Sequence, residues 1–528
     1  MRGAAAKRAV RVAAACAAAA LAAACGGPPR PAGPGAAAAT WVEVQTAHYL
    51  LRTDLPAAEA RALAAGFEEV YAAFLDLAFR SPRPPQARIE VVLFRHEAEL
   101  RRVVGGERWR GQFVRLDVDE RPTVVMVGGL DAATRWVFQH ELTHRFVRHH
   151  LPGAPVWLNE GLAAYHETLR LEGGRAILGE PSPCRGFFGG AGLRTGLERD
   201  GRCRVQYWVP VSRLPRVHEL LEADYLAFHA PAREGAFYAG SWALVHLLTN
   251  GAEDDRRRLR VTLDALARGA GARDAFAAGF RGVDLEALDG RLRRHLMEGL
   301  GRVWQVPYRP RPAPAPEAER GLRPDEVDLL FARVRPWTAA TRGAVTADLD
   351  RAVARAPGAA AAEPLYWRAR ARRAGGDLAG AEADLRQALA LRPDEPRAVF
   401  ALAALLHERA RRVPPPHRAL EPVAVLLERL AGLTEAAYAL NLIASFHAEQ
   451  GQPDRALPFA ERAVQGEPGC WSCLDTLAAV RFQQGDAAAA RALQQRALAL
   501  APERRVSRGM IERLRQYEAA VRGGAAPR

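Results

Sequence analysis

Residues 140–144 read HELTH, and residues 157–163 read WLNEGLA. Positions i and i+4 of an α-helix lie on one face, so His140 and His144 can present two imidazole nitrogens to one metal ion. Glu160 is the candidate third ligand, because two histidines and a glutamate are an established set for a catalytic zinc ion that keeps its fourth position open. The two stretches together indicate a zinc hydrolase site.

Glu141 follows the first histidine and points toward the open position rather than at the metal. There its carboxylate could accept a proton from bound water, which makes Glu141 the candidate general base. Apolar residues recur at helical spacing around both histidines, and the LPGAP run at 151–155 favours a reversal into a second helix that carries Glu160. The alternative is a pair of buried histidines on an amphipathic helix, which leaves Glu141 and Glu160 unexplained.

The two stretches resemble those of the gluzincin metallopeptidases, in which the third ligand is the Glu of an Asn-Glu-Gly motif on the next helix. The resemblance is closest to the bacterial peptidase-MA-like proteins. Residues 41–53 and 88–94 resemble strands of that family's N-terminal sheet. The resemblance implies an α+β zincin-like metallopeptidase domain over residues 41–304, with Zn²⁺ as its cofactor.

Residues 237–248, FYAGSWALVHLL, resemble the helix that carries a transition-state tyrosine in related zinc aminopeptidases. This implies that Tyr238 donates a hydrogen bond to the oxyanion, the alternative being a core tyrosine on an amphipathic helix. No Gly-x-Met-Glu-Asn element precedes the zinc helix, so an endopeptidase is expected rather than an exopeptidase. Thr123–Val127 is expected to be a strand at the sheet edge that pairs with an extended substrate.

The first 24 residues combine basic residues with an alanine-rich apolar run, which is typical of a signal peptide. The LAAAC run at 21–25 resembles a bacterial lipoprotein box, in which Cys25 is lipidated; ordinary cleavage after Ala24 is the alternative. Residues 25–40, rich in Pro, Gly and Ala, are expected to be a flexible tether. The sequence thus predicts an exported, membrane-anchored lipoprotein on the periplasmic side of the cell envelope.

Export would place the other cysteines in an oxidising compartment. Cys184 and Cys203 are a candidate disulfide, which would contribute about 3 kcal/mol. Cys470 and Cys473 form a lone C-x-x-C without a second pair or a thioredoxin-like pattern, which predicts a local disulfide or two packed thiols and no chemistry.

Residues 305–324 contain six prolines and are expected to be a linker. Beyond them the chain repeats with a period of 34 residues, that of tetratricopeptide repeats, in which small residues let paired helices approach closely. Three alanines and a proline mark each repeat: Ala369, Ala381, Ala388 and Pro393; Ala444, Ala456, Ala463 and Pro468; Ala478, Ala490, Ala497 and Pro502.

The first set precedes the second by 75 residues, or two periods plus seven, which predicts a degenerate repeat with an insertion around 412–418. Residues 326–357 are expected to form another, partial repeat. The sequence therefore predicts an all-α tetratricopeptide-repeat solenoid over residues 325–525, whose groove binds a protein partner. The alternative is a short array that caps the catalytic domain.

The chain has 528 residues, too many for one core, and 74 Lys and Arg against 60 Asp and Glu. The positive charge is mostly arginine scattered over the whole chain, and no nucleic-acid motif accompanies it, so no nucleic-acid partner is expected. Two functions are compatible with these features. The first is a zinc-dependent peptidase that acts on a peptide or protein substrate recruited by the repeats, and the second is a non-catalytic cell-envelope scaffold whose peptidase-like domain binds zinc.

Overall fold

The computed structural model describes residues 40–79, 88–104, 111–114, 123–128, 132–151, 153–180, 187–188, 209–223, 225–230, 233–298, 303–413, 420–501 and 508–523. The predicted signal peptide, the lipidation candidate Cys25 and the candidate disulfide between Cys184 and Cys203 lie outside these residues. Within the described ranges, no helix combines the length and apolar character needed to cross a membrane.

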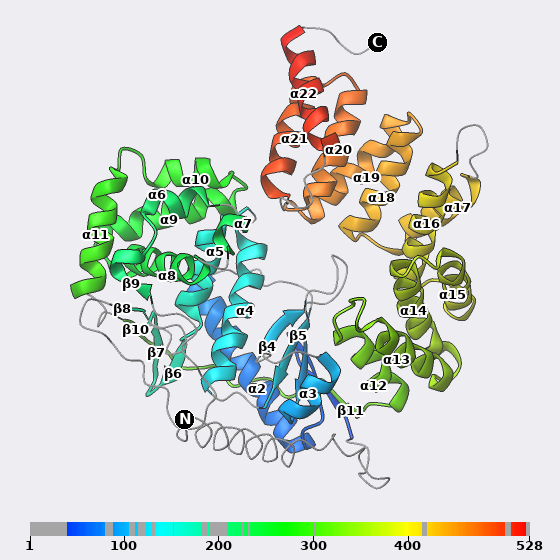
Figure 1. The fold of residues 1–528 in the computed structure, drawn as a ribbon, viewed down its shortest axis with the longest axis horizontal. Helices are drawn as coiled ribbons and strands as arrows, with labels where there is room; N and C mark the ends of the chain where they lie inside the picture. Colours follow the sequence, from blue (N-terminus) through cyan, green and yellow to red (C-terminus); the bar gives the residue numbers. More distant parts are fainter. Residues whose placement is uncertain are drawn as a thin grey trace, which may run out of the picture. The chain divides into compact units, whose positions relative to one another are not determined.

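A six-stranded mixed sheet opens the described chain (Figure 1), with strand order β11-β1-β2-β3-β5-β4. Its strands are β1 (Val42–Gln45), β2 (Tyr49–Thr53), β3 (Ile89–Phe94), β4 (Gly111–Val114), β5 (Thr123–Val127) and β11 (Ala318–Gly321). The central strands β2, β3 and β5 are parallel, and the outer pairings are antiparallel. The strands predicted within 41–53 and 88–94 are therefore present, the first stretch as a hairpin of two strands.

The prediction that β5 is the sheet edge is wrong. Val124 pairs with Val91 of β3 on one side and with Phe113 of β4 on the other. The edge is β4, whose four residues GQFV include a glycine and a glutamine. So short and weakly apolar a strand leaves no clear alternation in the sequence.

Both faces of the sheet are covered, which explains why every residue of β3 is buried. Val91 and Leu93 face a core that includes residues of α2 (Ala57–Ala73) and of the π-helical segment Phe74–Phe79. Val92 and Phe94 face a smaller cluster formed with α3 (Glu97–Val104) and α12 (Pro324–Val334). Strand β3 therefore contributes to two cores.

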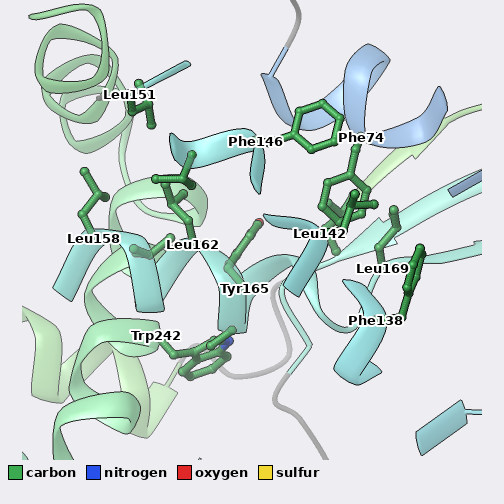
Figure 2. Close-up of a cluster of buried hydrophobic side chains, with 14 of the residues drawn as sticks. Phe74, Phe138, Leu142, Phe146, Leu151, Leu158, Leu162, Tyr165, Leu169 and Trp242 are labelled. Atoms are coloured by element: carbon green, nitrogen blue, oxygen red, sulfur yellow. The ribbon is translucent and has the colours of Figure 1, made fainter. Parts of the chain in front are cut away.

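The larger core extends into a group of helices that carries the predicted site. Figure 2 shows Leu142 and Phe146 of α4 (Ala132–His150), Leu158 and Leu162 of α5 (Val156–His166), and Trp242 of α8 (Glu234–Asn250) within one buried cluster. The remaining helices of this part are α6 (Val217–Glu222), α7 (Tyr225–Phe228), α9 (Glu253–Ala267), α10 (Ala272–Gly279) and α11 (Leu285–Glu298). A two-stranded pairing, β8 (Phe187–Phe188) with β9 (Val209–Pro210), also lies in this part.

The proline-rich stretch predicted as a linker over 305–324 contains paired strands. Strand β10 (Trp304–Pro307) pairs with β7 (Arg175–Leu178), which in turn pairs with β6 (Arg170–Glu172). Strand β11 pairs with β1. Most of the prolines lie between the two strands, and Pro307 is the last residue of β10, so the other paired residues keep their backbone N–H donors.

The C-terminal part is an all-helical array of paired helices, as predicted (Figure 1). After α12 its helices are α13 (Arg342–Arg355), α14 (Ala362–Ala374), α15 (Leu378–Leu391), α16 (Pro396–Arg411), α17 (Glu421–Leu433), α18 (Ala437–Glu449), α19 (Pro453–Gly466), α20 (Trp471–Gln483), α21 (Ala487–Leu500) and α22 (Arg508–Gly523). The nine alanines that mark the repeat are all 0 to 1% exposed: Ala369, Ala381, Ala388, Ala444, Ala456, Ala463, Ala478, Ala490 and Ala497. The small side chains therefore sit where the helices pack, and the predicted insertion falls between α16 and α17.

Helix α12 is joined to the sheet by a buried ion pair. The guanidinium of Arg333 donates to Glu90 of β3, with nitrogen–oxygen distances of 2.7 and 3.1 Å. Arg52 and Thr123 donate to the same carboxylate. Burial opposes the charge, but the two arginines lower the pKa of Glu90 to about 2. The first helix of the array thus also belongs to the packing of the sheet.

Candidate metal centre

Two histidines of α4 and one glutamate of α5 come together. The Nε2 atoms of His140 and His144 lie 3.5 and 3.6 Å from Oε2 of Glu160. Both histidines sit within one uninterrupted helix, and α5 begins directly after Pro155. The reversal predicted over 151–155 therefore carries Glu160 back to the histidine face of α4.

The spacing of these three atoms fits a zinc ion. His140, His144 and Glu160 each offer one ligand atom, and these atoms all lie within 4.8 Å of one another. Ligands placed about 2.1 Å from a tetrahedral zinc ion are about 3.4 Å apart, close to both imidazole–carboxylate distances. Within the described residues this is the one group of three or more His, Cys, Asp or Glu side chains with such spacing.

The other ring nitrogen of each histidine has a partner that sequence reasoning missed. Nδ1 of His140 lies 2.8 Å from Oε2 of Glu167, and Nδ1 of His144 lies 3.1 Å from Oδ1 of Asn159. A carboxylate only accepts hydrogen bonds, so His140 carries its proton on Nδ1 and turns the Nε2 lone pair toward Glu160. The signal lay in the motif itself, because Asn159 precedes the third ligand and Glu167 lies seven residues, two helical turns, after it.

Burial favours the neutral form of His144, which is the form that binds metal. His140 is 4% exposed and Glu160 is 7% exposed. Loss of solvation lowers the pKa of His144, and the nearby Glu160 and Glu141 carboxylates oppose that shift only in part. A neutral imidazole is the ligand form of histidine, so this environment favours coordination over protonation.

Glu141, the predicted general base, is half-buried on α4. It lies near enough to His144 to act on it electrostatically. Glu141 comes one residue after His140 and three residues before His144. On a helix it therefore lies at the border of the face that carries the two histidines, and not on that face. The role of Glu141 as general base stays a prediction.

Gly161, within the Asn-Glu-Gly run, lets α5 and α8 touch. A Cβ at this position would lie 2.6 Å from the carbonyl oxygen of Ser241 and 2.8 Å from Cγ2 of Val245. Only glycine permits this approach without a shift of one helix. The glycine therefore fixes the position of the helix that carries Glu160.

Tyr238 lies on α8, three residues before Ser241, whose backbone approaches Gly161 of α5. Its half-buried ring packs edge-on against Phe228 and lies 5.9 Å from the ring of His229. The structure thus places Tyr238 among aromatic side chains of α7 and the residue that follows it. Its role as an oxyanion donor stays a prediction.

Other histidines near the motif belong to their own surroundings. His166 is buried and His150 is half-buried, and burial lowers the pKa of each to about 4. A ring nitrogen of His246 lies 2.7 Å from one of His295 on α11. None of these side chains belongs to the group of His140, His144 and Glu160.

Comparisons with known proteins find likeness to solved tetratricopeptide-repeat structures. TTC0263, a thermophilic TPR protein in Thermus thermophilus, is 20% identical over 37% of this chain and 98% of its own, with a TM-score of 0.30. MamA is 15% identical over 30% of this chain and 89% of its own, with a TM-score of 0.26. YrrB, a TPR protein with an unusual peptide-binding site, is 14% identical over 36% of this chain and 90% of its own, with a TM-score of 0.28.

No family model matches the sequence, and no curated protein matches it. The structural likenesses are too low in score to add to the helix pairing described above. The case for a function therefore depends on the side chains of this chain.

Proposed function

We propose that this protein is a zinc-dependent hydrolase of peptide bonds, with His140, His144 and Glu160 as the metal ligands. The observation that carries the proposal is the convergence of two Nε2 atoms on one carboxylate oxygen, with each Nδ1 held by a further residue. Two imidazoles and one carboxylate are the donor set of hydrolytic zinc sites. A purely structural zinc site is usually closed by four protein ligands, so a set of three favours catalysis.

A bound Zn²⁺ would polarise the scissile carbonyl and acidify water at its open position. The residues of the chain would supply the proton transfers and the orientation. Glu141 would take a proton from water and pass it to the leaving amine. Glu167 and Asn159 would keep the two imidazoles in the orientation in which Nε2 binds the metal.

Tyr238 is proposed as a hydrogen-bond donor to the oxyanion that forms on the substrate carbonyl. Its support is its place on α8, the helix that packs closely against the helix of Glu160 at Gly161. The phenol would act in the transition state, so its removal is expected to lower the rate of hydrolysis and leave zinc binding unchanged.

The helical array is proposed to recruit a protein substrate or partner. Arrays of stacked helix pairs present an extended surface to which peptide segments bind. The N-terminal sequence supports the further proposal that the protein is exported and anchored by lipid at Cys25, since a basic start, an apolar run and a cysteine follow one another there.

The experiment that tests this function compares the full chain with Glu141→Gln. Zinc content and cleavage of unfolded proteins and peptide libraries are measured on both. Wild type is expected to cleave and the variant to keep its zinc while losing at least about a hundredfold in rate. Glu286→Gln, an exposed glutamate of α11, is the matched control and should behave as wild type. Zinc binding without cleavage by the wild-type chain would contradict the peptidase proposal and favour the scaffold.

A further inference from the structure

The C-x-x-C pair of the helical array is a disulfide at the start of a helix. Cys470 and Cys473 are bonded to each other, so the local disulfide is the alternative that is present. Cys470 occupies the N-cap of α20, where its Sγ accepts a hydrogen bond of 3.2 Å from the backbone N–H of Cys473. The bond thus lies across the first turn of a 13-residue helix.

Its two sulfurs belong to residues that differ in access to solvent. Cys473 is 0% exposed and packs with Leu440 of α18 and Ala463 of α19. Cys470 is 9% exposed and is followed by the half-buried Trp471. An external thiolate must reach the sulfur that it attacks, so Cys470, the less buried of the two residues, is the one expected to be attacked, and Cys473 is the leaving group.

The surroundings of Cys470 suit a thiolate. The N-terminus of a helix carries partial positive charge, and the Cys473 N–H is already directed at the Cys470 sulfur. The hydroxyl of Ser472 lies 3.4 Å from the same sulfur. These groups stabilise negative charge on Cys470 once the disulfide opens, which is the condition that makes a cysteine reactive.

Stability alone does not account for this bond. A disulfide restricts the unfolded chain in proportion to the logarithm of the loop that it closes, and this one joins residues three apart. Its effect on the unfolded state is therefore smaller than that of a long-range bridge. An exchange role explains the short spacing and the helix N-terminus together.

We propose that Cys470 and Cys473 form a thiol–disulfide exchange site that takes an external dithiol as its reductant. A thiolate of the dithiol attacks Sγ of Cys470, which forms a mixed disulfide and releases Cys473 as a thiolate that then takes a proton. The second thiolate of the dithiol then attacks the reductant-derived sulfur of the mixed disulfide. This step releases Cys470 as a thiolate that takes a proton, and it yields the oxidised dithiol with an internal disulfide. Two electrons and two protons pass to the pair, independently of the proposed metal centre.

Reduction would alter a junction of three helices. Cys470 and Cys473 share a buried cluster with Leu440 of α18 and Ala463 of α19. Opening the bond removes the covalent tie across the first turn of α20 at this junction. The oxidation state of the pair would therefore affect the packing between two neighbouring helix pairs.

The test equilibrates the full chain in buffers of reduced and oxidised dithiothreitol and alkylates it in stages. Both cysteines lie in the tryptic peptide 463–481, in which fragment masses separate Cys470 from Cys473. The pair is expected to titrate reversibly as one two-electron couple. In the reduced chain, Cys470 should be alkylated at pH 7 at least about tenfold faster than Cys473.

Two single variants test the direction of attack. With oxidised glutathione as the probe, Cys473→Ser should accumulate a mixed disulfide at Cys470, whereas Cys470→Ser should accumulate little at Cys473. A pair that stays oxidised in reduced dithiothreitol while the chain is folded would overturn the proposal, as would equal alkylation rates for the two thiols. The alkylation of the wild-type chain decides the matter even where a variant fails to fold.

Discussion

Nδ1 of His140 lies 2.8 Å from Oε2 of Glu167. The carboxylate fixes the tautomer of the imidazole and directs Nε2 toward Glu160. In this account Glu167 is a positioning residue, because it acts on the metal only through His140.

Replacing Glu167 with Ala should weaken zinc binding by about 10- to 100-fold, since the imidazole of His140 loses its orientation. Competition with a fluorescent chelator measures the affinity. Glu172→Ala, a change at an exposed glutamate of β6, is the control and should leave the affinity as in wild type. An unchanged affinity in Glu167→Ala would show that the hydrogen bond plays no part in binding.

Gly161→Ala should destabilise the chain by about 1 to 3 kcal/mol, because its methyl group meets the backbone of Ser241. Urea-induced unfolding measures the change in free energy. Gly432→Ala is the matched control, since Gly432 lies in helix α17 with open space where a Cβ would be. The control should be neutral or slightly stabilising, and equal effects at the two glycines would contradict the close approach of α5 and α8.

Glu90→Gln should destabilise the chain by about 3 kcal/mol at pH 7, because it removes the buried carboxylate that Arg333 and Arg52 share and leaves Arg52 with Glu43 alone. The pKa of Glu90 is lowered from 4.5 to about 2. Its contribution to stability is therefore complete above pH 4.5 and is lost as the pH falls toward 2.

The difference in unfolding free energy between wild type and Glu90→Gln should accordingly shrink between pH 4.5 and pH 2. Urea titrations at a series of pH values measure this difference directly. Glutamine resembles the protonated acid, so the two chains should converge at the acid end. A difference that stays constant over this range would mean that Glu90 is not held ionised by the arginines.

Ala381→Leu should destabilise the array by about 1 to 3 kcal/mol, because Ala381 is buried where α14 and α15 pack. Ala379→Leu places the same side chain at an exposed position of the same helix and should change stability little. Thermal unfolding followed by circular dichroism distinguishes them. Equal tolerance at both positions would argue against close helix packing at the repeat alanines.

The convergence of His140 and His144 on one side chain and the helical repeats could be predicted because each depends on regular spacing. His140 and His144 share a helix face at i and i+4, and the buried alanines recur at a fixed period. Strand β4 could not be predicted, because four residues with little alternation carry no clear signal. Without β4, the sequence favours β5 as the sheet edge.

Asn159 and Glu167 were missed for a different reason. Their spacing from Glu160 is regular, but their roles depend on which ring nitrogen of each histidine faces Glu160, and spacing alone does not determine that. Strands β10 and β11 were not predicted, because the prolines between them indicate a linker and because their partners β7 and β1 lie far away in the sequence. Long-range pairing of this kind has no local signature.

The most direct test of the central claim is the zinc content of the full chain after saturation with zinc and exhaustive dialysis. Elemental analysis should find about one zinc ion per chain in wild type and a large loss in Glu160→Gln, because the carboxylate that faces both imidazoles is gone. Wild-type chain without zinc, or a Glu160→Gln variant that holds as much zinc as wild type, would contradict the assignment of His140, His144 and Glu160 as a metal centre.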